Sequence, residues 1–113
     1  MESMSRNRRK SIRLKYPIKD RPQIGIKGRG YPIIDISLTG MKFRYTAGIS
    51  VPKGTQIEAP VQFGDRAQLT IKGTVVRVLG DLIMINFAKP IDRKILSKEA
   101  DYLLEKYGKL DAS

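Results

Sequence analysis

The 113-residue sequence contains no cysteine, no histidine and no tryptophan. The lack of cysteine excludes disulfides, thiolate nucleophiles and cysteine zinc sites, and the lack of histidine removes the commonest metal ligand and general base. No apolar run approaches the roughly 20 residues of a membrane span, and the first residues do not resemble a signal peptide. We therefore expect one small cytoplasmic domain that has no enzymatic activity, no metal and no cofactor.

Charge is strongly one-sided. The chain has 22 Lys and Arg against 11 Asp and Glu, a formal net charge of +11, and a large part of this excess falls in residues 1–30. A localised excess of this kind favours an anionic partner. Residues 1–15 carry too few large aliphatic side chains to form an apolar face, so we predict a flexible basic arm there that becomes ordered only with a ligand.

From residue 16 onward, short apolar segments separated by Gly and Pro predict a single β domain over residues 16–113. The predicted strands cover residues 23–27, 32–37, 41–46, 55–63, 68–79 and 81–87. The apolar period then changes, and the spacing predicts an amphipathic helix over about 92–107 that ends at Gly108. This pattern predicts a mainly β fold, a six-stranded antiparallel barrel or curved sheet whose end or edge is covered by a C-terminal helix.

Two clusters of charged and polar residues are candidates for a functional site. The first is the basic run from Arg8 to Arg13, and the second is Asp35-Ile-Ser37-Leu-Thr-Gly40, where one apolar strand ends and another begins. Together with the outward residues that follow the second cluster, its Asp and Ser side chains predict a polar strand face of mixed charge. Gly40 would permit a positive φ or a close approach of backbone to ligand.

The spacing Arg9-x-x-x-Arg13 followed by Asp35-x-Ser37-x-x-Gly40 resembles the PilZ domain. The resemblance covers nearly the whole chain, including a Gly-Thr-Val-Val-Arg-Val strand, an Ile-Met-Ile-Asn-Phe strand and the C-terminal helix. It implies a split-barrel-like barrel of six antiparallel strands with a C-terminal α-helix. It also implies binding of cyclic di-GMP, a bacterial second messenger.

Cyclic di-GMP carries two phosphodiester charges and two guanines, and arginine suits both because its planar fork matches phosphate oxygens and the guanine O6 and N7 edge. The resemblance implies that Arg9 and Arg13 contact phosphate and guanine, that Asp35 and Ser37 read a guanine, and that Gly40 shapes the turn. The ligand-binding set also includes Arg44, as a further contact on the polar face. It includes Arg8 as well, because an Arg directly before the first motif resembles the sequence of family members that bind two stacked ligand molecules.

Other interpretations apply to each motif taken alone. Asp-x-Ser-x-x-Gly is most often an Asx or ST turn, the basic run can be a solvated tail or a nucleic-acid arm, and residues 27–30 suggest a basic hairpin tip. On the helix, we expect Glu99 to lie on a solvated face and the tyrosines Tyr102 and Tyr107 to pack in the core or at its rim.

Three functions follow for the whole chain. The favoured one is a cyclic di-GMP receptor that acts by ligand-induced ordering of its arm and through a downstream protein partner in motility and biofilm formation, secretion or polysaccharide synthesis. The alternative is a small basic β-barrel that binds RNA or single-stranded DNA, although its aromatic residues Phe43 and Tyr45 fall on the apolar face rather than on a base-stacking face. A family member that acts only as a scaffold is the third possibility.

Overall fold

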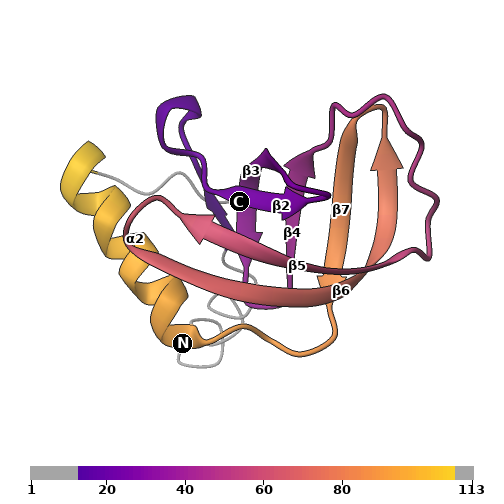
Figure 1. Cartoon of the computed structure of the whole chain (residues 1–113). Coiled ribbons are helices and arrows are strands. Elements are labelled where there is room, and N and C mark those ends of the chain that lie inside the picture. Colours follow the sequence, from indigo (N-terminus) through magenta and orange to yellow (C-terminus); the bar gives the residue numbers. More distant parts are fainter. Residues whose placement is uncertain (1–12, 109–113) are drawn as a thin grey trace.

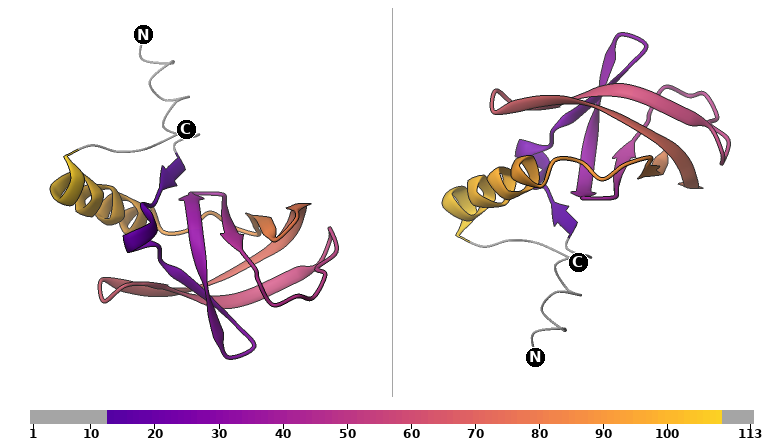
Figure 2. Two further views of the ribbon diagram at one scale, coloured as in Figure 1. Left: turned by 90° about the horizontal axis from the view of Figure 1, so that it is seen from above. Right: turned by 90° about the horizontal axis from the view of Figure 1, so that it is seen from below.

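The computed structural model describes residues 13–108 (Figure 1, Figure 2). In chain order its elements are β1 (Arg13–Lys15), the 3-10 helix η1 (Ile18–Asp20), β2 (Gln23–Ile26), β3 (Arg29–Ser37), β4 (Gly40–Arg44), β5 (Gln56–Phe63), β6 (Ala67–Leu79), β7 (Leu82–Phe87) and α2 (Arg93–Tyr107). All six predicted strands and the predicted helix are present, and β1 and η1 are additional.

The strands form one closed antiparallel barrel. Their order is β1-β3-β2-β5-β6-β7-β4, and the further pairing of β3 with β4 closes the ring over six strands, β2 to β7. β1 lies outside this ring and pairs with the second half of β3, on the edge where β2 pairs with the first half. The predicted fold class is therefore confirmed.

Strand alternation fills the barrel, because successive side chains point to opposite faces. In β4, Met41 and Phe43 are buried while Lys42 and Arg44 are only half-buried on the other face. β6 follows the same rule, with Ile71 and Val75 inside. The β6–β7 hairpin turns at Gly80, whose φ of 61° is in the left-handed region that favours glycine.

The prediction of a flexible arm over residues 1–15 is wrong for residues 13–15, which form β1. Leu14 is 1% exposed, and β1 pairs in register with β3, Arg13 with Ser37 and Lys15 with Asp35. The sequence pattern failed here because burial of Leu14 and pairing with the edge of β3 are enough to order three residues. Residues 1–12 lie outside the described residues, so mobility of the arm there stays a prediction.

Helix α2 begins and ends with two recognisable caps. The Asp92 carboxylate accepts a hydrogen bond of 2.9 Å from the Lys94 N–H. Gly108 takes the left-handed conformation with φ 76°, and its N–H donates to the Leu104 carbonyl over 2.8 Å. In Figure 1 the helix lies beside the turn between β5 and β6, and Leu103 is buried in the apolar core.

The expectation that Glu99 lies on a solvated helix face is wrong. Its side chain is 2% exposed, and its carboxylate accepts hydrogen bonds from the Tyr16 hydroxyl at 2.7 Å and from Nε and Nη2 of Arg66 at 2.8 and 2.9 Å. Burial, followed by the charge of Glu99, raises the pKa of Tyr16, and the hydrogen bond to Glu99 raises the pKa of Arg66. The Glu99 carboxylate can be buried because Arg66 neutralises it and both Arg66 and Tyr16 donate hydrogen bonds to it.

A second polar contact joins α2 to the segment that follows β1. Asp20 accepts a hydrogen bond of 2.8 Å from the Tyr102 hydroxyl, accepts another from the Tyr107 hydroxyl, and lies 3.0 Å from Lys106 Nζ. The hydrogen bond from Tyr107 is the main cause that lowers the pKa of Asp20 to about 2. The Arg66 guanidinium lies 3.8 Å from the centre of the Tyr102 ring, so Tyr102 packs at the rim of the barrel. Within residues 13–108, no helix is both long and apolar enough to span a membrane.

Candidate functional site

The second arginine of the first motif and the aspartate of the second motif meet on the outer face of the barrel. Nη1 of Arg13 lies 2.8 Å from Oδ1 of Asp35. The contact follows from the register of β1 on β3, which places Lys15 opposite Asp35. Arg13 lies two residues before Lys15, on the same face of β1. Two segments far apart in the sequence therefore contribute to one site.

A β-bulge places Asp35 on the outer face of the barrel, where its side chain is 1% exposed beneath its ion-pair partners. Ile33 pairs with Phe43 but Asp35 already pairs with Lys42, so the extra residue Ile34 interrupts the alternation. Ile33 and Ile36 can then both be buried at 0% exposure while Asp35 lies beside Lys42 on the polar face. Lys42 Nζ is 3.4 Å from Asp35 Oδ2, so the carboxylate has a cation on each oxygen.

These residues line a groove across β1, β3, β4, β7 and β6, with a volume of about 460 Å³. It is lined by Arg13, Lys15, Asp35, Met41, Lys42, Val76, Met84, Ile85 and Asn86. Three cationic side chains against one carboxylate give the groove a positive balance. Lys15 and Lys42 were not predicted as ligand contacts, although period-two alternation places Lys15 on the same face as Arg13 and could have identified it.

Ser37 takes part in a turn. Its hydroxyl accepts a hydrogen bond from the Thr39 N–H and donates one to the Gly40 carbonyl, both at 3.3 Å, and its side chain is buried. This is the ST-turn geometry that the motif alone suggests. A ligand that uses the Ser37 hydroxyl as a donor must therefore replace the contact with the Gly40 carbonyl.

The structure corrects the reason for Gly40. Its φ is not positive, and a Cβ at this position would lie 2.5 Å from the carbonyl oxygen of Ile85. The glycine therefore permits close approach of β4 to β7, and a close approach of its backbone to a ligand stays a prediction. Its place in the motif is explained by the packing of the strand that follows the turn.

The remaining predicted site residues are not part of the described groove. Nη1 of Arg44 lies 2.5 Å from Oδ1 of Asp81 in the β6–β7 turn, and Arg44 does not line the groove. Arg8 and Arg9 lie outside the described residues. Within residues 13–108, no acidic cluster is placed to hold a metal ion.

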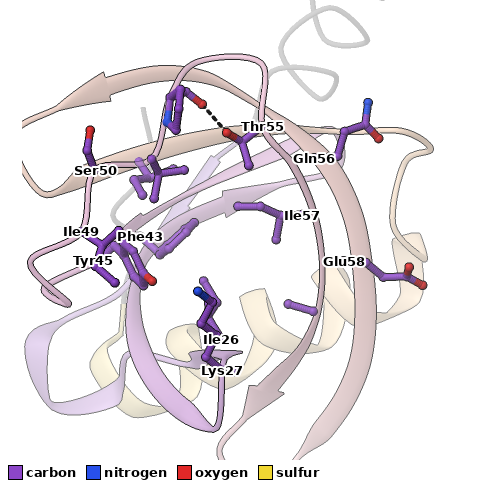
Figure 3. A pocket seen from close by; sticks show the side chains of 15 residues that line it. Ile26, Lys27, Phe43, Tyr45, Ile49, Ser50, Thr55, Gln56, Ile57 and Glu58 are labelled. Atoms are coloured by element: carbon purple, nitrogen blue, oxygen red, sulfur yellow. Dashed lines mark hydrogen bonds between the residues drawn. The ribbon is translucent and has the colours of Figure 1, made fainter.

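A second opening lies between the β2–β3 turn and the loop before β5 (Figure 3). It has a volume of about 400 Å³ and a mainly aliphatic and aromatic lining that reaches Phe43 and Ile83 in the core. Phe43 and Tyr45 are 0% and 8% exposed, so neither can stack on a base. Nothing in the described residues supports the nucleic-acid alternative.

Comparison with known proteins agrees with the barrel. The crystal structure of an uncharacterized Legionella protein superimposes with a TM-score of 0.62 at 18% identity, covering 86% of this chain and 98% of the Legionella chain, which shows a shared fold. No curated protein matches the sequence. The family model of the PilZ domain, a family of cyclic di-GMP-binding domains, matches residues 7–105. The chain therefore belongs to the PilZ domain family.

Proposed function

We propose that this protein is a receptor for cyclic di-GMP that binds the ligand in the groove of Arg13 and Asp35 and has no catalytic activity. The observation that carries the proposal is the 2.8 Å contact between these two side chains, because it joins one residue of each motif at a single groove. Membership of the PilZ family supports the same ligand.

The charge of the groove suits a dianion. Arg13, Lys15 and Lys42 together outnumber the single carboxylate of Asp35, so a net positive balance remains for two phosphodiesters. The Arg13 side chain is 35% exposed, so its guanidinium can reach an incoming phosphate while the backbone of β1 stays paired. Arg9, which the motif places four residues earlier, would add a second guanidinium.

Asp35 gives the site its preference for guanine. A carboxylate accepts hydrogen bonds only, and guanine offers the donors N1–H and N2–H2 on one edge, whereas adenine does not offer that pair. Asp35 is held by Arg13 and Lys42, so its position is fixed before the ligand arrives. The ligand must share the carboxylate with these two cations, or displace one of them onto its phosphates.

The arm would act as the clamp. Residues 1–12, which carry Arg8 and Arg9, would close over a ligand held against β3 and β4, and the ordered arm would present a surface that a downstream protein partner recognises. The cellular process, whether motility, secretion or polysaccharide synthesis, would be set by that partner.

Arg8 bears on stoichiometry. Two stacked dinucleotides bring four phosphodiester charges, more than Arg9 and Arg13 can neutralise, and Arg8 would supply a further guanidinium. Arg8→Leu is therefore expected to lower the ligand-to-protein ratio at saturation from two to one while binding persists. Calorimetric titration of both proteins checks this, and a native ratio of one that the variant leaves unchanged would contradict it.

The function itself is tested by isothermal titration calorimetry of the full chain with cyclic di-GMP, with GTP and a short single-stranded oligonucleotide as comparisons. We expect saturable binding of cyclic di-GMP and much weaker binding of GTP, which presents one guanine and no cyclic backbone. Tighter binding of the oligonucleotide than of cyclic di-GMP would refute the proposal in favour of a nucleic-acid function.

A further inference from the structure

We propose that the protein has a docking groove for an extended acidic peptide, which would add to the free edge of β6 as an extra strand. The groove lies between the first half of β6 and the segment that joins β7 to α2, and its volume is about 550 Å³. In Figure 1 this segment runs beneath β6 on its way to the helix. The groove is separate from the candidate ligand site, and the proposal does not depend on cyclic di-GMP.

The edge of β6 is free because β6 is longer than its partner. β7 pairs with Gly73–Leu79, and the last contact on this edge is the hydrogen bond of 2.8 Å from the Ala88 N–H to the Lys72 carbonyl. The chain then bends at Ala88 and Lys89 and continues beside the groove without strand pairing. Within the described part of the chain, β6 has no strand partner on this edge before Lys72.

The direction of the free backbone groups follows from the register. Val75 donates its N–H to Thr55 and accepts at its carbonyl from Gly54, both on the β5 side. Because the N–H and C=O groups of a strand residue point to the same side and alternate along the strand, Thr70 and Gln68 direct theirs to the opposite edge. These two residues offer two donors and two acceptors to an added strand.

The neighbouring strand shows how such an edge is usually protected. Pro60 of β5 pairs with Thr70 and therefore faces away from β6, toward the edge where the pairing of β2 with β5 ends at Val61. Proline has no N–H to donate, and it commonly blocks pairing at an edge strand. The β6 edge carries no proline, so it remains competent to pair.

The lining of the groove specifies the side chains of the occupant. Its inner wall is apolar and consists of Leu69, Ile71, Phe87, Ile91 and Ile95. Its outer rim carries the exposed Lys72 and Lys89, while the one acidic residue of the lining, Asp92, is occupied by its cap on α2. A strand laid on this edge would alternate apolar residues toward the inner wall with residues beside the lysines, and acidic residues complement that rim.

The test uses a short synthetic peptide, acetylated and amidated, in which valine alternates with glutamate. Titration of the full chain, followed by hydrogen–deuterium exchange, should show saturable binding and slower exchange at the amides of Gln68 and Thr70. A peptide with N-methyl groups on its alternate, edge-facing amides should lose binding, because strand addition requires its backbone donors. Failure of the glutamate peptide to bind, or protection confined to other strands, would overturn the proposal.

Charge reversal distinguishes binding of the peptide in this groove from nonspecific electrostatic attraction to a basic protein. Lys72→Glu together with Lys89→Glu should weaken the glutamate peptide roughly tenfold and strengthen a counterpart peptide with lysine in place of glutamate. Lys19→Glu with Lys53→Glu is the matched control, because both lysines are exposed and lie outside the groove. An equal loss in the control pair would overturn the proposal.

A second copy of the chain is the competing occupant. Sedimentation velocity over a range of concentrations, with exchange measured in parallel, detects it. Protection of Gln68 and Thr70 that grows with protein concentration, and that the peptide cannot displace, would assign the edge to self-association and overturn the proposal.

Discussion

Replacement of Arg13 by alanine is the most direct test of the ligand site. The change removes the only motif arginine within the described residues and leaves Asp35 with one cation, Lys42 at 3.4 Å. It should leave the fold in place, because β1 is held by backbone pairing with β3 and by Leu14, which is 1% exposed. Affinity and stability can therefore be separated in the same variant.

The size of the effect follows from the exposure of Arg13 and from its present partner. A hydrogen bond to a charged group contributes about 1.5–3 kcal/mol. Arg13 is 35% exposed and must give up part of its contact with Asp35 to bind phosphate, so we expect the lower part of that range. A loss of about 1.5–2 kcal/mol corresponds to a roughly 10- to 30-fold weaker Kd. Arg13→Ala leaves the Asp35 carboxylate, which is 1% exposed, with Lys42 as its remaining cation, so the unfolding free energy should fall by about 1–3 kcal/mol.

Calorimetry with cyclic di-GMP gives the affinity, and urea denaturation gives the stability. Arg13→Lys should fall between alanine and the native protein, because lysine keeps the charge but loses the planar fork. Arg29→Ala is the matched control, because Arg29 is an exposed arginine at the start of β3, beside the β2–β3 turn and outside the groove. Its removal makes the same change in net charge. Native affinity in Arg13→Ala, or an equal loss in Arg29→Ala, would refute the assignment of Arg13.

Three further substitutions test other parts of the argument. Asp35→Ala should reduce the preference for cyclic di-GMP over cyclic di-AMP, which we expect to be worth about 1–3 kcal/mol in the native protein; competition calorimetry measures it, and native selectivity in the variant would contradict the role of the carboxylate. Gly40→Ala should lower the unfolding free energy by about 1–3 kcal/mol, because its Cβ would lie 2.5 Å from the Ile85 carbonyl oxygen; an unchanged urea midpoint would show that β4 and β7 separate easily. Glu99→Gln should destabilise the domain by about 3 kcal/mol, the lower end of the range for a broken buried ion pair, because the side chain of its partner Arg66 is 24% exposed. Thermal unfolding tests this, and a native melting temperature would show that the ion pair makes no net contribution to stability.

Most of the fold could be predicted because its determinants are local. Alternation in Met41–Tyr45, the turn glycine Gly80 and the left-handed cap at Gly108 each follow from neighbouring residues alone. β1 could not be predicted in this way, since it exists only because the edge of β3 extends past the end of β2. Its order is a tertiary property with one local signal, the apolar Leu14.

The candidate site was predictable in its residue types but not in its arrangement. The motifs identify Arg13 and Asp35, whereas their contact depends on the bulge at Ile34, which no propensity in the sequence indicates. The prediction that Glu99 lies on a solvated helix face was wrong for a similar reason. A charged residue on a helix is buried only when distant partners neutralise it. In both cases pairing between distant segments overrides the local pattern.

The turn of the second motif, between β3 and β4, is hydrogen-bonded to two residues that line the proposed peptide groove. The Thr39 carbonyl accepts a hydrogen bond of 2.8 Å from the Phe87 N–H, and the Leu38 carbonyl accepts one of 2.9 Å from the Ile91 N–H. The turn of the second motif is therefore bonded to the wall of the groove beside β6. A ligand that rearranged this turn would change the free energy of peptide binding, and by linkage the peptide would change the affinity for the ligand by the same factor. In this way the domain would report ligand binding to a partner through two backbone hydrogen bonds.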